Sequence, residues 1–295
     1  MHKISGLLAA TLLFVGCAAV TLDLPSITDE PTGIRSDGRV VWRDLITTTP
    51  AESRRFYGEL FGWTFHAPGV ALGFGGDESY MLIRHEGRLI GGMLDGNTLE
   101  AEEEVSQWIT VISVDDIAAA VSTARQQGGE ILTEPTYLPS RGTLAVLRDH
   151  EGALFAMIET RDGDPEQFSP EFGDFLWDEV WSGNVTESAE FYQSVVGYSA
   201  ASPDAAGLEY EYRVMSSAGE PRAGIMRNPF KELQPVWINY LRVADPEAVA
   251  SKVEALGGQV IVPAQPRDIG GSVALVAGPS GAGIALQSWS EESSE

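Results

Sequence analysis

Two stretches of the chain alternate between two faces with a period of two, Val40–Thr47 and Phe175–Ser182, and each predicts a β-strand. In the first stretch, Trp42 and Asp44 share one face of the strand. After it, apolar residues recur at helical spacing in the run FYGELFGW, which begins at Phe56. The pattern therefore predicts a strand followed by a helix that packs one side against a sheet.

The expected helices have recognisable ends. The run Thr49–Glu52 reads as a capping box with proline at the first helical position, and Asn184 and Glu187 occupy the equivalent places later in the chain. Another helix is expected to begin after Asp115-Asp116 and to end at Gly128-Gly129, because glycine adopts the left-handed conformation that closes a helix. With the short strands between them, the elements of each module are expected in the order strand, helix and three strands, and this order occurs twice.

The second half of the chain repeats the first. FYGELFGW returns as FYQSVVGY, and Trp42 and Asp44 return as Trp177 and Glu179, displaced by 135 residues. Further along, the displacement falls to 129 residues. A repeat of this length indicates two copies of a whole module and not a solenoid of small units.

Composition marks the boundaries of these modules. Residues 1–16 read as a signal peptide and residues 17–38, rich in Thr, Ser, Asp, Pro and Gly, as a flexible tether. The first module is expected over residues 39–160 and the second over residues 174–290, joined by a polar linker over residues 161–173.

The N-terminus carries a targeting pattern. Lys3 precedes an apolar run, Ile4–Val15, that is too short to span a bilayer. The sequence Phe14-Val15-Gly16-Cys17 resembles the lipobox of bacterial lipoproteins, which implies lipidation of Cys17 and a place in the bacterial cell envelope. An ordinary secretory peptide is the alternative. Since Cys17 is the only cysteine, the chain forms no intramolecular disulfide.

The charge of the chain limits its partners. At pH 7 the formal net charge is −24 over 295 residues. Nucleic acid and anionic lipid surfaces would be repelled, so we expect no nucleic-acid partner, and contact with a membrane only through the lipid anchor. The oligomeric state is left open by the sequence.

An ordered set of motifs, present in both halves, resembles the vicinal oxygen chelate superfamily, which includes glyoxalase I, extradiol dioxygenases and bleomycin-resistance proteins. The resemblance implies an α+β fold with two tandem glyoxalase-like modules, each made of paired βαβββ units with concave mixed sheets. The motifs are Trp42–Leu45, Phe56-Tyr57, Phe61–Trp63, Val114–Asp116, Gly128-Gly129 and Asp149–Gly152 in the first copy, and Phe191-Tyr192, Gly197, Gly257-Gly258 and Pro279–Gly281 in the second.

The resemblance also implies where a metal would bind. Superfamily enzymes hold a divalent metal through His, Gln and Glu side chains at fixed places on the sheets. None of the residues aligned with those places coordinates a metal, so we expect no metal and no cofactor; an oxygen-only site for Mg²⁺ or Mn²⁺ using Asp44, Glu179 or Glu159 is the alternative. The aligned residues are Trp42 and Trp177, then Trp108 or Ile109 and Trp237 or Ile238, and finally Ala156 and Ala285.

The replacing residues suggest a pocket of their own. Indole faces attract aromatic rings and cations, and a nearby carboxylate strengthens the attraction for a cation. The competing interpretation makes the tryptophans core and the carboxylates partners of an arginine such as Arg43, Arg84 or Arg213. The candidate pocket residues are Trp42, Asp44, Trp108, Trp177, Glu179 and Trp237.

Catalytic machinery is not evident in the sequence. There is no thiol after Cys17, no Gly-x-Ser-x-Gly run and no Ser–His pair that stands out, so we name no catalytic residue. The sequence favours a protein that binds or sequesters a small aromatic or cationic molecule, as the bleomycin-resistance branch does. The alternatives are a metal-dependent glyoxalase-like lyase, isomerase or dioxygenase, and a non-catalytic envelope scaffold.

Overall fold

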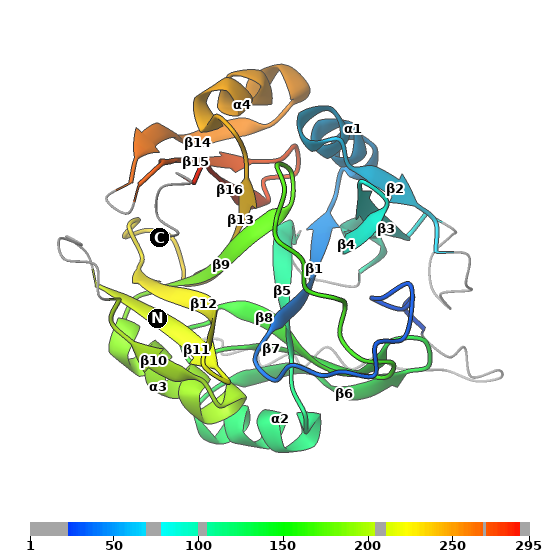
Figure 1. The fold of residues 1–295 in the computed structure, drawn as a ribbon, viewed down its shortest axis with the longest axis vertical. Coiled ribbons are helices and arrows are strands. Elements are labelled where there is room, and N and C mark those ends of the chain that lie inside the picture. Colours follow the sequence, from blue (N-terminus) through cyan, green and yellow to red (C-terminus); the bar gives the residue numbers. More distant parts are fainter. Residues whose placement is uncertain (1–22, 69–77, 100–104, 204–210, 268–269, 290–295) are drawn as a thin grey trace, which may run out of the picture.

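Each half of the chain folds as one mixed sheet with two helices packed on it. The structure is a computed structural model that describes residues 23–68, 78–99, 105–203, 211–267 and 270–289. Two eight-stranded sheets meet near the centre of the molecule, with α1 and α4 together at one end and α2 and α3 together at the other (Figure 1). The α+β fold with two tandem glyoxalase-like modules is confirmed.

The first module consists of two βαβββ units. Its strand order is β2-β3-β4-β1-β5-β8-β7-β6, with β1 antiparallel to β5 where the units join and parallel to β4. The elements are β1 (Val40–Thr47), α1 (Pro50–Phe61), β2 (Thr64–His66), β3 (Tyr80–His85), β4 (Arg88–Asp95), β5 (Gln107–Ser113), α2 (Ile117–Gln126), β6 (Glu130–Leu138), β7 (Gly142–Arg148) and β8 (Leu154–Thr160), with a 3₁₀ turn, η1, at Gly96–Thr98.

The second module repeats this plan. Its strand order is β10-β11-β12-β9-β13-β16-β15-β14, with the same parallel and antiparallel joins around β9 and β13. The elements are β9 (Phe175–Ser182), α3 (Val185–Val196), β10 (Ser199–Ala201), β11 (Tyr212–Ser217), β12 (Glu220–Arg227), β13 (Val236–Arg242), α4 (Pro246–Val253), β14 (Gln259–Pro266), β15 (Ser272–Ala277) and β16 (Gly283–Gln287), with a 3₁₀ turn, η2, at Glu254–Leu256.

The helix starts show how local sequence sets these elements. The Asn184 side chain caps α3 by accepting the Glu187 amide at 3.3 Å, as its position predicts. Helix α1 begins at Pro50 as predicted, but the Thr49 side chain makes no capping hydrogen bond. Instead the Thr47 hydroxyl accepts the Thr49 amide at 3.2 Å, so the cap comes from the preceding strand.

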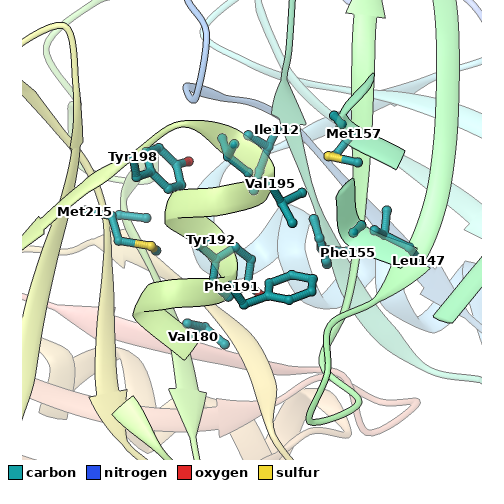
Figure 2. Close-up of a cluster of buried hydrophobic side chains, with 14 of the residues drawn as sticks. Ile112, Leu147, Phe155, Met157, Val180, Phe191, Tyr192, Val195, Tyr198 and Met215 are labelled. Carbon is teal, nitrogen blue, oxygen red and sulfur yellow. The ribbon is translucent and has the colours of Figure 1, made fainter. Parts of the chain in front are cut away.

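The two modules share their hydrophobic cores. Each sheet has an inner face, which packs on the helices and on the other module, and an outer face turned away from it. Figure 2 shows one of the two shared clusters, in which strands of the first module meet α3 and its neighbouring strands. The first module contributes Ile112, Leu147, Phe155 and Met157, and the second contributes Val180, Phe191, Tyr192, Val195, Tyr198 and Met215.

The segments outside the sheets are also fixed by contacts. The amides of Thr32 and Gly33 donate to the Asp162 carbonyl, and the Asp164 carboxylate accepts the Ser36 amide at 2.7 Å. The described part of the expected tether, from residue 23 onward, therefore packs against the first module and the start of the linker. In the part of the chain that the structure describes, no helix is long and apolar enough to cross a membrane.

Candidate functional site

The outer face of the first module centres on a partly buried carboxylate. Asp44 on β1 accepts hydrogen bonds from the Tyr80 hydroxyl at 2.6 Å and from the Trp42 indole at 2.9 Å. Arg141, which precedes β7, lies 3.3 Å from the second Asp44 oxygen and donates to the Tyr80 hydroxyl at 2.7 Å. The Arg141 side chain is fully buried, so its charge depends on Asp44 for compensation.

The second module builds the same kind of cluster around Glu179 on β9. The Tyr212 and Tyr240 hydroxyls donate to its two oxygens, and the Trp177 indole donates to Tyr212 at 3.0 Å. Arg267 approaches Glu179 at 3.7 Å. The duplicated chain thus holds a Trp–carboxylate–Tyr–Arg cluster on the outer face of each sheet.

A glycine on the neighbouring strand makes room for each tyrosine. Gly92 pairs with Asp44 in the sheet, and a Cβ atom built there would lie 1.9 Å from the Tyr80 hydroxyl oxygen. Gly224 pairs with Glu179, and its Cβ would lie 2.1 Å from the Tyr212 hydroxyl oxygen. Any side chain at these positions would push the tyrosine off its carboxylate.

The electrostatics of both clusters are internally balanced. Burial raises the pKa of Tyr80, Tyr212 and Tyr240, so all three stay protonated and can donate at neutral pH. Each carboxylate also has an arginine partner. A salt bridge of the kind considered from the sequence therefore forms in each module, with Arg141 and Arg267 as the partners.

The arginines named as candidates from the sequence bind elsewhere. Arg43 pairs with Asp178 across the module interface, and Arg84 pairs with Asp29. Arg213 lies 3.8 Å from Glu211. This corrects the choice of partner, because strand order and not sequence distance decides which arginine reaches Asp44.

Trp108 and Trp237 are separated from these clusters. Both lie in the cores on the inner faces, where the Trp108 indole donates to the Tyr57 hydroxyl at 3.2 Å and the Trp237 indole to the Tyr192 hydroxyl at 2.9 Å. This corrects their expected place in a pocket. Successive side chains of a strand point to opposite faces, and it is Ile109, the neighbour of Trp108, that takes the outer face.

The outer faces do not fit a metal of the superfamily type. In the first module Trp42, Val111 and Ala156 would have to be donors at neighbouring positions on β1, β5 and β8, and none can coordinate a metal.

 Trp42 pairs with Val111, and Val111 pairs with Ala156, so these three side chains form one row. The equivalent row of the second module is Trp177, Tyr240 and Ala285.

This geometry also corrects the second aligned position. The residues in line with the opening tryptophans are Val111 and Tyr240, and not Trp108, Ile109, Trp237 or Ile238. The Tyr240 hydroxyl is a protonated donor to Glu179. Within the described ranges, no group of three or more His, Cys, Asp or Glu side chains could hold a metal ion.

The sequence analysis missed the tyrosines and arginines of the clusters. One signal could have revealed two of them: Tyr80 and Gly92 return as Tyr212 and Gly224, each displaced by 132 residues. A tyrosine and a glycine kept together in both copies indicate a close contact between side chain and backbone. Arg141 and Arg267 lie on hairpins of different length and carry no such signal.

The fold is that of a protein with two tandem glyoxalase-like modules. Residues 39–157, the first module, match the family model described as "Glyoxalase/Bleomycin resistance protein/Dioxygenase superfamily", and this module is of that superfamily. One relative is "Putative glyoxylase CFP32" of Mycobacterium tuberculosis, 29% identical over 243 residues that cover 82% of this chain and 91% of the relative. Another is "Anthracycline biosynthesis protein DnrV" of Streptomyces peucetius, 24% identical over 239 residues that cover 76% of this chain and 83% of the relative.

Solved structures share the fold at low sequence identity. The Mn(II)-bound glyoxalase from Novosphingobium aromaticivorans superposes with a TM-score of 0.58 at 13% identity, covering 85% of this chain and 82% of that one. Homoprotocatechuate 2,3-dioxygenase from B. fuscum superposes with a TM-score of 0.56 at 13% identity, covering 90% of this chain and 74% of that one. These likenesses establish the tandem fold alone.

Proposed function

We propose that the outer face of the second module binds a small aromatic molecule without a metal. The observation that carries this proposal is the half-buried indole of Trp177, which stands beside the Glu179 cluster on an apolar surface. Small-molecule sites are typically lined by apolar and aromatic side chains with a few placed polar groups. The other partly buried side chains that pack against this apolar cluster are Met226, Phe230, Val236, Val262 and Val273.

The balance of charge favours an aromatic ligand over a cationic one. Glu179 already accepts two tyrosine hydroxyls and faces Arg267, so it offers little net attraction to a further cation. The exposed part of the Trp177 ring can still stack on a planar molecule. The clusters therefore act as a rigid polar floor, and the ligand contacts the aromatic and apolar side chains.

One relative supports this ligand class. The Streptomyces peucetius protein is named for the biosynthesis of an anthracycline, and anthracyclines are planar aromatic compounds. A glyoxalase activity, suggested by the name of the mycobacterial relative, would need metal donors that the rows at Trp42 and Trp177 do not supply. We therefore place binding ahead of metal-dependent catalysis.

The experiment is a titration of the purified protein with 8-anilinonaphthalene-1-sulfonate, followed by fluorescence and calorimetry. Trp177→Ala should weaken binding by about 5-fold, since an aromatic contact contributes about 1 kcal/mol and 1.4 kcal/mol corresponds to 10-fold. Tyr137→Ala is the matched control, because Tyr137 is an aromatic residue on β6 that is 61% exposed. Equal binding by the wild type and Trp177→Ala would refute the proposal.

We also propose that Cys17 carries a lipid that holds the protein in the bacterial cell envelope. Cys17 lies outside the described residues, and the support is the apolar run that ends in Gly16-Cys17. Cys17→Ser should move the protein from the membrane fraction of cells to the soluble fraction. A variant that stays with the membranes would contradict the lipobox interpretation.

A further inference from the structure

We infer that the outer face of the first module is a binding site for an extended acidic peptide, and that residues 23–29 of the same chain occupy it. These residues, Asp-Leu-Pro-Ser-Ile-Thr-Asp, are called the plug below. The inference concerns the first module only and does not depend on the ligand proposed for the second.

The centre of the plug is an isoleucine in an apolar site. Ile27 is 2% exposed and belongs to the same buried cluster as Trp42, Val111 and Ala156, the row that crosses the three central strands. Its side chain thus covers the place where the superfamily's concave site is expected. Pro25 is buried as well, while Ser26 between them is half-buried.

Polar contacts hold the plug on both sides of that isoleucine. The Asp23 carboxylate accepts the Ser140 amide at 2.9 Å and the Ser140 hydroxyl at 2.7 Å. The Pro25 carbonyl accepts the Arg141 Nε at 2.9 Å, and the Asp29 carboxylate pairs with Arg84. The plug thus has one buried apolar side chain, with a carboxylate bound by hydrogen-bond donors on each side of it. Proteins commonly hold peptide ligands through such a combination of contacts.

Arg141 links the plug to the cluster beneath it. Its Nε binds the plug backbone, while its Nη1 and Nη2 atoms bind Asp44 and Tyr80. Arg141 therefore connects the Asp44 cluster of the first module directly to the backbone of the plug. In the second module, Arg267 approaches Glu179 in the same way.

Among the described residues, no linker residue joins the apolar cluster on the outer face of the second module, where an equivalent plug would lie. A displacement of 135 residues from Ile27 leads to Asp162, directly after β8, where the chain is leaving the first module. The equivalent tryptophans differ accordingly: Trp42 is 1% exposed, whereas Trp177 is half-buried. The duplicated protein thus carries one site closed by residues 23–29 and one site at which the described residues leave Trp177 partly exposed.

The test measures binding of a fluorescein-labelled synthetic peptide spanning Asp23–Glu30 by fluorescence anisotropy. The wild type should not bind the peptide, because its own plug fills the site. Ile27→Asp should release the plug, since a charge cannot remain in the apolar cluster, and the vacated site should bind the added peptide. A peptide in which aspartate replaces the isoleucine is the control and should not bind either protein.

Two outcomes would overturn the inference. One is equal binding of the peptide to the wild type and to Ile27→Asp. The other is no binding to Ile27→Asp up to about 1 mM peptide, which is the order of the effective concentration that a short tether provides. Ile27→Ala, which shortens the side chain without adding charge, should give the same result with weaker binding, and circular dichroism checks that both variants are folded.

Discussion

Arg43 and Asp178, which occupy equivalent positions in the two repeats, form a two-pronged ion pair across the module interface. The Arg43 Nε donates to Asp178 Oδ1 at 2.8 Å, and the Arg43 Nη2 donates to Asp178 Oδ2. Thr110 and Asn239 are also equivalent, and the Asn239 amide donates to the Thr110 hydroxyl at 2.9 Å. Equivalent residues that touch one another lie on a pseudo-two-fold axis, so the chain is built like a fused dimer.

We predict that reversing one charge of this pair destabilises the protein. Arg43→Asp leaves two carboxylates facing each other, and losing one partner of a buried pair costs about 3–5 kcal/mol. The double variant Arg43→Asp/Asp178→Arg restores opposite charges and should recover part of the loss in urea unfolding. If the double variant loses as much free energy of unfolding as the two single variants lose together, this account of the pair is contradicted.

Asp44→Asn should destabilise the protein by about 3–5 kcal/mol. The change leaves the fully buried Arg141 side chain without its counter-charge. Glu130→Gln is the matched control: it breaks the pair with Arg148, whose members are 64% and 44% exposed, and should cost less than about 1 kcal/mol. Equal midpoints of urea denaturation for the two variants would show that Asp44 is not an ion-pair partner in solution.

Gly92→Ala should lower the free energy of unfolding by about 1–3 kcal/mol, because the added methyl group would overlap the Tyr80 hydroxyl and the Asp44 carboxylate. Gly283→Ala is the control on another strand, since nothing lies within 4 Å of its added Cβ. Thermal melts of the two variants give the comparison. A Gly92→Ala protein as stable as Gly283→Ala would mean that the Tyr80 and Asp44 side chains can move aside at little cost in free energy.

The protein should lose stability at alkaline pH through its buried tyrosines. Burial raises their pKa above the value of about 10 that they have in the unfolded chain. Below pH 10 both states are protonated; above it only the unfolded state releases protons, so the free energy of unfolding falls as pH rises. The residues concerned are Tyr57, Tyr80, Tyr192, Tyr198, Tyr212 and Tyr240.

Absorbance at about 295 nm measures this titration directly. A tyrosine in an unfolded chain ionises at a pKa of about 10. The six buried residues should ionise together at higher pH, in step with the loss of circular dichroism. A smooth titration of all tyrosines near pH 10 in a folded protein would contradict the buried clusters.

The fold could be predicted from the sequence because its signals are local and written twice. The strand at Val40–Thr47 and its copy at Phe175–Ser182 have the bounds that alternation predicts. The same alternation placed Trp42 and Asp44 together on one face, as observed. Trp108 was misplaced because its strand, Gln107–Ser113, is apolar on both faces, and such a strand gives no signal of which side is the pocket.

The site partners could not be predicted, because they depend on distances along the chain that no local pattern spans. Arg141 reaches Asp44 from 97 positions away, and it does so across the sheet from the hairpin before β7. The cover provided by Ile27 was hidden for another reason. A polar stretch with a single isoleucine is interpreted as a tether from its sequence. Only the contact with the apolar row formed by Trp42, Val111 and Ala156 makes Ile27 part of a core.

The shared cores make the two modules one folding unit. One cluster joins Phe155 of the first module to Phe191 and Trp237 of the second, and the other joins Tyr57 and Trp108 to residues of α4 and β16. Neither module alone can bury its inner face. A protease cut in the linker should therefore leave two fragments that stay associated, and each fragment expressed alone should aggregate unless its complement is present.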